Sequence, residues 1–196
     1  MNKLRVGICG WGNVATGLFK TLQTNSVEIK KRSNLEIEII AIGARRDNPK
    51  CDPGNVIIER DIFKIIDHDI DVIVELIGGV DVARDLILKA LNAKKHVVTA
   101  NKAVIFNHGN ELFSVANKNG VKLLYESSVC AGTPIIKLLN QELAASKISK
   151  ISGMLNGTSN FILSNMEEGM EFEPTLKLAQ EKGYAEPDPS FDIEGT

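Results

Sequence analysis

The chain alternates between short apolar runs and amphipathic stretches as far as residue 125. The apolar runs occupy positions 4–9, 35–41, 71–77, 96–99 and 122–125, and the run at 71–77 is rich in β-branched residues. Such runs predict interior strands of a parallel sheet. Between two of them, apolar residues recur at intervals of three and four, which predicts one helical stripe: Ala83, Leu86, Ile87, Ala90 and Leu91. This alternation predicts an α/β fold with a doubly wound parallel sheet.

The pattern changes after Pro134. Residues 135–144 and 172–182 are expected to be helical, residues 148–155 to form a strand, and residues 156–160 to form a polar turn before a further helix. These elements predict a second region of mixed α+β character, which we expect to be incomplete because no closing element follows the loop at 183–192. We therefore expect one domain over residues 1–128 and the first part of another over residues 129–196.

Composition and charge narrow the possible functions. The 196 residues are 43% hydrophobic and 24% charged, with a net charge of -2. Charges of both signs are interspersed, so we expect neither nucleic acid nor an anionic membrane as a partner. No stretch reaches the roughly 18 apolar residues of a membrane span and no secretory signal is recognisable, so we expect a cytoplasmic protein. The three cysteines are widely spaced, which favours reduced thiols.

The strongest functional motif follows the first predicted strand. Gly10, Gly12 and Ala15 reproduce the spacing G-x-G-x-x-A with which a strand-to-helix turn holds a dinucleotide. Gly10 permits a tight turn, Gly12 lets the backbone approach the phosphates, and the helix N-terminus offers unpaired N–H groups to the anion. The motif predicts a Rossmann-type fold and a nicotinamide dinucleotide cofactor. The alternative is an ordinary strand-to-helix turn without a ligand.

Two arginines after the second predicted strand bear on the choice of cofactor. In NAD-binding proteins an acidic residue here accepts a hydrogen bond from the ribose 2′-hydroxyl, whereas this chain has Arg45 and Arg46. Guanidinium groups suit a 2′-phosphate, because each stays charged and donates a pair of hydrogen bonds. We therefore expect NADP(H) to be preferred over NAD(H). The alternative is a solvated basic turn in which Asp47 neutralises one arginine.

Two further segments offer groups for catalysis or substrate binding. Lys102 directly follows a predicted strand at the sheet edge where a ligand should lie. A lysine beside a bound nicotinamide can donate to a carbonyl oxygen or hold a carboxylate. The proline-stiffened loop at 183–192 carries closely spaced carboxylates, which could bind a substrate ammonium group or orient a lysine. The alternatives are an ordinary surface lysine and a solvated acidic linker.

Several segments together resemble the homoserine dehydrogenase family, and the resemblance covers the whole chain. They are residues 100–102, 125–136, 155–162 and, most specifically, 183–195. The resemblance implies an NAD(P)-binding domain followed by a mixed region that binds substrate and forms a homodimer. It also implies reversible hydride transfer between NADP(H) and the aldehyde of L-aspartate 4-semialdehyde, giving L-homoserine for threonine, methionine and isoleucine biosynthesis.

The resemblance further implies roles for individual residues. The pyrophosphate would be surrounded by Gly10, Gly12, Asn13 and Val14, and the nicotinamide side would be formed by Gly78 and Lys102. The substrate pocket would be formed by Gly157, Thr158 and Tyr184, with Glu186 facing the substrate's amino group and Asp192 hydrogen-bonding within the pocket. A carboxylate opposite an ammonium group is a charge-assisted pair. Lys102 and Asp192 are thereby the candidate catalytic residues.

A cation site is also implied by the resemblance. A monovalent cation such as sodium would be held by Glu126 and by the backbone carbonyls of Val129, Ala131 and Thr133. Hard oxygen ligands of this kind suit a hard cation better than a transition metal.

One departure from the family pattern affects the expected activity. The family signature continues past Gly195 to an aspartate and then to a lysine, the general acid of the reaction, and the chain ends before either. Because a general acid contributes on the order of 100- to 10,000-fold, we expect this chain, as a truncated fragment, to be nearly inactive. The alternatives are a non-catalytic dinucleotide-binding module or sensor subunit, and a relative acting on another small aldehyde or amino acid.

Overall fold

The computed structural model of the chain describes residues 2–130, 132–154, 156–185 and 189–194. The chain divides into two compact units, Met1–Leu138 and Leu139–Thr196. The domain boundary after residue 128 that we expected stays a prediction. Among the described residues, no helix combines the length and apolar character that crossing a membrane requires.

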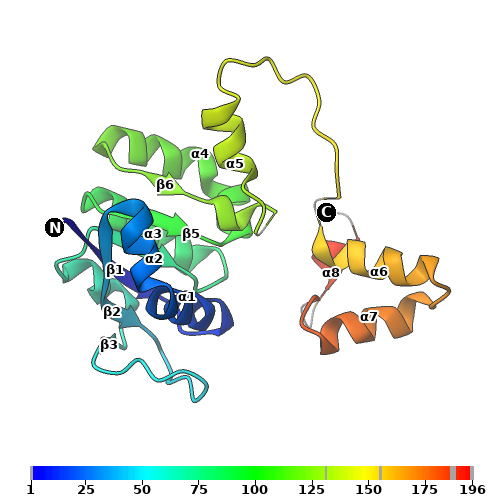
Figure 1. Cartoon of the computed structure of the whole chain (residues 1–196), viewed down its shortest axis with the longest axis horizontal. Helices are drawn as coiled ribbons and strands as arrows, with labels where there is room; N and C mark the ends of the chain where they lie inside the picture. The colour runs from blue at the N-terminus through cyan, green and yellow to red at the C-terminus, as the bar shows by residue number, and fades with distance from the viewer. Residues whose placement is uncertain (1, 131, 155, 186–188, 195–196) are drawn as a thin grey trace. The chain divides into compact units, whose positions relative to one another are not determined.

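A six-stranded sheet forms the centre of the first unit, with the order β3-β2-β1-β4-β5-β6 (Figure 1). Its strands are β1 (Asn2–Cys9), β2 (Leu35–Gly43), β3 (Ile57–Glu59), β4 (Val72–Glu75), β5 (His96–Thr99) and β6 (Leu123–Leu124). Every neighbouring pair is parallel. This is the strand order of dinucleotide-binding Rossmann folds, and it confirms the predicted α/β class. The order reverses between β1 and β4, and ligands bind outside the carboxyl ends of strands at such a point.

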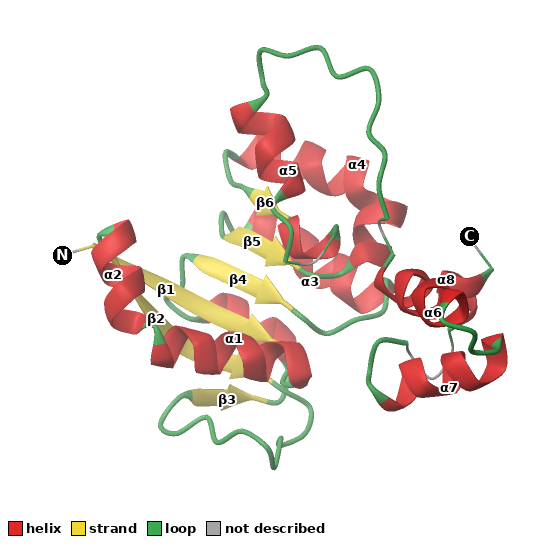
Figure 2. Cartoon of the chain, turned by 45° about the vertical axis from the view of Figure 1, so that its right-hand side comes forward, coloured by secondary structure: helices red, strands yellow, loops and turns green. Residues whose placement is uncertain are grey.

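Helices cover both faces of this sheet (Figure 2). They are α1 (Asn13–Thr24), α2 (Ser26–Ser33), α3 (Asp81–Asn92) and α4 (Lys102–Asn119), with short 3-10 helices η1 (Ile62–Asp67) and η2 (Glu126–Ser128). One buried cluster joins Ile8 to Ala15 and Phe19 of α1. The opposite cluster joins Cys9 to residues of α3 and α4. Ile8 and Cys9 serve different clusters because adjacent residues of a strand point to opposite faces.

The apolar stripe predicted between residues 83 and 91 is confirmed as the buried face of α3. All five of its side chains are fully buried: Ala83, Leu86, Ile87, Ala90 and Leu91. The stripe packs in the same cluster as Val104 and Leu112 of α4. Burial of this face, rather than helix propensity, supplies most of the stability of such a helix.

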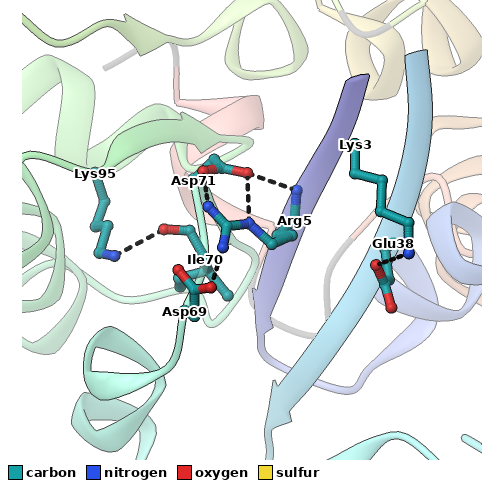
Figure 3. Close-up of polar contacts among 7 residues, drawn as sticks. All are labelled: Lys3, Arg5, Glu38, Asp69, Ile70, Asp71 and Lys95. Atoms are coloured by element: carbon teal, nitrogen blue, oxygen red, sulfur yellow. Dashed lines mark hydrogen bonds and ion pairs between the residues drawn. The ribbon is translucent and has the colours of Figure 1, made fainter. Parts of the chain in front are cut away.

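Charged contacts fasten the start of β4 to β1 (Figure 3). The Arg5 guanidinium donates to both carboxylate oxygens of Asp71, at 3.1 and 2.7 Å, and the Arg5 backbone N–H donates to the same carboxylate at 2.8 Å. Arg5 also pairs with the more exposed Asp69. Next to them, Lys95 donates to the backbone carbonyl of Ile70 at 2.7 Å. These contacts lie where β4 begins, at the end of the sheet away from the glycine turn.

The second unit contains helices α6 (Gly157–Glu167), α7 (Phe172–Glu181) and α8 (Ser190–Ile193). The predicted helix at 172–182 is confirmed by α7. The helix expected at 135–144 is present as α5 (Ile135–Lys137) and the π-helical turn η3 (Leu138–Glu142). The prediction of a strand at 148–155 is wrong for residues 148–154, which are irregular. Residue 155 lies outside the described residues. A strand needs a neighbour to satisfy its backbone groups, and the described residues after 138 include no other strand.

Candidate functional site

A cavity of about 560 Å³ opens at the carboxyl ends of β1, β2 and β4. Its lining comes from the glycine turn after β1, the loop after β2, the first residues after β4, and Ile62 of η1. Gly10, Gly12 and Asn13 belong to this lining, and so do Arg45 and Arg46. The structure therefore brings together five of the residues that the sequence assigned to the cofactor.

Gly10 makes the turn possible. Its φ of 103° is a conformation that side chains rarely adopt, and an added Cβ would lie 2.5 Å from the backbone oxygen of Leu76. Its N–H donates to the carbonyl of Gly43 at 2.8 Å, which closes the turn against the end of β2. Gly12 differs, because a Cβ there would meet nothing within 4 Å. The open space above Gly12 is what close approach of a phosphate to the backbone requires.

Helix α1 begins at this cavity with its first amides uncapped by a side chain. Its N-cap is Gly12, and its first turn contains no acidic residue. The partial positive charge of the helix N-terminus is therefore not offset locally, which suits an anion. Asn13 lines the cavity, whereas the Val14 side chain is 63% exposed and is not part of the lining.

The single tryptophan of the chain also lines the cavity. Trp11 is nearly buried and meets Phe19 of α1 edge to face, with ring centroids 5.2 Å apart. The Asn48 amide donates to the Trp11 carbonyl and to the Thr16 hydroxyl, each at 3.0 Å. Asn48 thereby fastens the loop after β2 to the glycine turn.

Arg45 and Arg46 are exposed, and within the described residues neither has a hydrogen-bond or ion-pair partner. Asp47 instead accepts from Arg60 at 2.6 Å, and Arg60 also donates to the carbonyl of Ala44 at 3.2 Å. From the sequence, Asp47 is an alternative partner that could neutralise Arg45 or Arg46. In the structure its partner is Arg60, which follows β3.

Gly78 and Lys102 lie on neighbouring loops of the same sheet edge. Gly78 and Gly79 follow β4 with φ of 71° and 72°, and Lys102 is the first residue of α4. Asn101 joins the two loops: its side chain accepts from the N–H of Val104 at 3.1 Å and donates to the carbonyl of Gly79 at 2.6 Å. Neither Gly78 nor Lys102 lines the 560 Å³ cavity.

Sequence reasoning missed Glu75, the last residue of β4. Its side chain is fully buried beside the two loops, where it accepts from the N–H of Ile77 at 2.8 Å and from the Thr99 hydroxyl at 2.5 Å. The available signal was a carboxylate inside an apolar β-branched run. Burial, and secondarily the charge of Glu75, raises the pKa of the Cys9 thiol to about 12, so Cys9 stays protonated and unreactive.

Two of the residues expected to hold a cation, Glu126 and Thr133, contact the start of α5. Both carboxylate oxygens of Glu126 accept backbone N–H groups, from Ile136 at 2.8 Å and Lys137 at 2.9 Å. The Thr133 carbonyl accepts from the N–H of Ile135 at 2.9 Å. Val129 follows η2, and Ala131 lies outside the described residues. In the described part of the chain, no three or more histidine, cysteine or acidic side chains are grouped so that they could hold a metal ion. The expected site uses mainly backbone carbonyls and stays a prediction.

Within the second unit, three of the expected substrate residues meet. The Thr158 hydroxyl donates to the carbonyl of Tyr184 at 2.7 Å and lies 3.0 Å from a carboxylate oxygen of Asp192. The Asn156 amide donates to the other Asp192 oxygen at 2.8 Å, and its carbonyl caps α6. Gly157 is the first residue of α6. Glu186 lies outside the described residues.

Two family models match the chain. The model described as homoserine dehydrogenase, NAD binding domain, matches residues 10–126. The model described as homoserine dehydrogenase matches residues 134–196. Together they match residues in both units.

Curated relatives and solved structures agree with these matches. Homoserine dehydrogenases of Pseudomonas aeruginosa and Neisseria gonorrhoeae are 50% and 43% identical over 100% of this chain, covering 45% and 46% of their own length. The chain thus spans about half the length of these relatives. The Thiobacillus denitrificans enzyme structure superposes with a TM-score of 0.91 at 42% identity, covering 98% of this chain and 45% of that one. The structure of a hyperthermophilic archaeal homoserine dehydrogenase in complex with NADPH superposes with a TM-score of 0.82 at 27% sequence identity. The match covers 98% of this chain and 65% of the archaeal chain.

Proposed function

Because the chain belongs to the homoserine dehydrogenase family, we propose that it binds NADP(H) in its first unit. We further propose that the protein to which it belongs interconverts L-homoserine and L-aspartate 4-semialdehyde. The observation that carries the cofactor proposal is the cavity at the switch point of the sheet. That cavity combines an obligatory glycine, an uncapped helix start and two unpaired arginines among the described residues.

The pyrophosphate would lie over Gly12, where the backbone leaves room, and would accept hydrogen bonds from the first amides of α1. Asn13 and the backbone of Val14 would contribute from the same helix start. The fit is supported by the absence of a competing carboxylate in the first turn of α1. The guanidinium groups of Arg45 and Arg46 would pair with the 2′-phosphate, which is what distinguishes NADP(H) from NAD(H).

Two observations support the preference for NADP(H). Asp47 is engaged by Arg60, so the charges of Arg45 and Arg46 are not offset by their neighbour. The archaeal homoserine dehydrogenase that superposes on this chain is described in complex with NADPH.

When bound, the cofactor would supply a hydride to the aldehyde carbon or take one from the alcohol. The chain's own part in this reaction would be electrostatic and orienting. The Lys102 ammonium, at the start of α4, would lie near the nicotinamide side with Gly78 and stabilise negative charge on the substrate oxygen. Thr158, Tyr184 and Asp192, with Gly157 and Glu186, would hold the substrate, and the carboxylate of Glu186 would pair with its ammonium group.

Two assembly features complete the proposal. A monovalent cation such as sodium would be held by Glu126 and the carbonyls of Val129, Ala131 and Thr133, and the protein would be a homodimer. Both rest on family membership. Sedimentation of the full-length protein and the sodium dependence of its activity test them.

Titration calorimetry with NADPH and NADH tests the cofactor proposal on this chain directly. We expect NADPH to bind and NADH to bind more weakly. The activity is tested on the full-length protein by following NADPH oxidation with aspartate semialdehyde. A folded chain that binds neither cofactor contradicts the first proposal, and binding without turnover by the full-length protein contradicts the second.

A further inference from the structure

Glu75 is the one charged side chain that is fully buried within the described part of the chain. It ends β4, a strand whose other residues are valine and isoleucine. A buried carboxylate is costly unless hydrogen bonds compensate it. An apolar residue would fill this place in the strand at less cost, so the structure of the strand alone does not account for a carboxylate here.

One compensating hydrogen bond comes from the loop after β4, and the other comes from the buried last residue of β5. One carboxylate oxygen accepts from the N–H of Ile77, in the loop after β4, and the other accepts from the Thr99 hydroxyl at the end of β5. The same Thr99 oxygen accepts from the N–H of Asn101 at 3.0 Å. One buried carboxylate is therefore linked to the loop that follows each of two neighbouring strands.

Asn101 continues these links between the two loops. Its amide donates to Gly79, which lies beside Gly78, and its carbonyl caps α4, which begins at Lys102. The chain Glu75–Thr99–Asn101–Gly79 thus connects both loops to a single buried group. These are the loops that the proposed function assigns to the nicotinamide side.

The glycine turn and the arginine loop, which line the cavity, are held by different contacts. Gly10 is held to Gly43, Asn48 to Trp11, and Arg60 to Ala44 and Asp47. None of these contacts includes Glu75 or Thr99. Ile77, a partner of Glu75, also belongs to the cavity lining, but the contacts that hold the glycine turn and the arginine loop do not pass through Glu75. A change at Glu75 should therefore disturb the loops after β4 and β5 more than the glycine turn and the arginine loop.

We propose that Glu75, acting through Thr99 and Asn101, is a positioning residue for the nicotinamide half of the cofactor. It holds the Gly78 turn and the start of α4 at Lys102 in the arrangement that receives the nicotinamide ring. The inference rests on the proposed function and adds to it a residue that does not itself touch the ligand.

The test compares two ligands that differ only in the nicotinamide. NADPH carries it, whereas 2′-phospho-ADP-ribose has the same pyrophosphate and 2′-phosphate without the ring. Glu75→Gln keeps the size of the side chain but cannot accept from both donors. We expect it to weaken NADPH binding about tenfold, the effect of losing a hydrogen bond to a charged group. Binding of 2′-phospho-ADP-ribose should change by less than about twofold, both measured by calorimetry on the full chain.

Thr99 provides matched variants. Thr99→Val keeps the shape and removes the hydroxyl, so it should reproduce the ligand-selective loss. Thr99→Ser keeps the hydroxyl and should bind NADPH nearly as the unmodified chain does. If Glu75→Gln does not fold, as judged by circular dichroism, this pair of Thr99 variants decides the question.

The outcomes separate a positioning role from a structural one. The inference is overturned if Glu75→Gln or Thr99→Val weakens the binding of NADPH and of 2′-phospho-ADP-ribose equally, or weakens neither. It is also overturned by a Thr99→Ser variant as impaired as Thr99→Val. If the unmodified, folded chain binds neither ligand, the proposed function fails and this inference fails with it. If that chain binds both ligands and the variants do not discriminate between them, only the inference fails.

Discussion

Gly10 and Gly12 lie in the same turn, but the first is needed for the backbone conformation and the second for space above the backbone. Alanine substitutions distinguish these two roles. At Gly10 a Cβ would meet the Leu76 oxygen at 2.5 Å with φ at 103°. Gly10→Ala should therefore destabilise the chain by about 1 to 3 kcal/mol, the range for a residue forced into an unfavourable conformation, and abolish NADPH binding. At Gly12 a Cβ meets nothing. Gly12→Ala should lower stability by less than about 1 kcal/mol.

Gly12→Ala should nevertheless weaken NADPH binding, because its methyl group would occupy the space proposed for the phosphates. Urea unfolding and calorimetry on both variants measure the two effects. A Gly12→Ala variant that binds NADPH normally contradicts the placement of the pyrophosphate over this residue.

The two cavity arginines carry the cofactor preference in our proposal. Replacing both Arg45 and Arg46 with serine should weaken NADPH binding about tenfold or more, since each guanidinium gives charge-assisted hydrogen bonds to a phosphate. NADH binding should stay unchanged. Asp47→Asn is the control, because Asp47 is 84% exposed and its partner is Arg60, and an exposed pair contributes little. Loss of both cofactors to the same extent would contradict a 2′-phosphate role.

At the scale of elements, the contact between β1 and the start of β4 makes stability depend on pH. The Arg5 guanidinium, through hydrogen bonds to the Asp71 carboxylate, holds the pKa of that carboxyl below its ordinary value of 3.8. The stabilisation is therefore fully present above the unfolded pKa and is lost as the pH falls through the lower folded pKa. Asp71→Asn should cost about 1 to 2 kcal/mol at neutral pH.

In acid the difference between Asp71→Asn and the unmodified chain should shrink, because Asp71 is then protonated in both states. Urea midpoints measured from neutral pH down through the acid range, to well below the unfolded pKa, test this. Asp69→Asn is the matched control: Asp69 is 83% exposed, so its removal should change the midpoint little. If the difference in urea midpoint between Asp71→Asn and the unmodified chain did not change with pH, the stabilising role of the ionised Asp71 carboxylate would be contradicted.

Elements with a strong local pattern could be predicted from the sequence, and those decided by distant partners could not. The turn at Gly10 and the stripe of α3 follow from spacing alone, and the structure confirms both. The strand expected at 148–155 has suitable residues but no neighbouring strand among those described. Helix α2, with no buried residue, lacks the stripe that would have indicated it. The partner of Glu75 is Thr99, 24 residues away, which no local pattern reveals.

At the scale of the molecule, all residues of the proposed cofactor cavity belong to the first unit. Both buried clusters of the sheet also lie in that unit. We therefore expect residues 1–138, expressed alone, to fold cooperatively and to bind NADPH within about threefold of the whole chain, a difference under 1 kcal/mol. Circular dichroism melting and calorimetry test this. A non-cooperative melt, or loss of binding in a folded piece, would show that residues beyond 138 are needed.

Because the cavity wall contains the chain's single tryptophan, this molecule carries its own optical reporter. Indole emission overlaps the absorption band of a dihydronicotinamide, so excitation of Trp11 should pass to reduced cofactor seated in the cavity and dim the protein's fluorescence. The oxidised cofactor lacks that absorption band, so it should accept no excitation energy from Trp11 by this route. The redox state of the bound ligand could then be followed in real time, without any label.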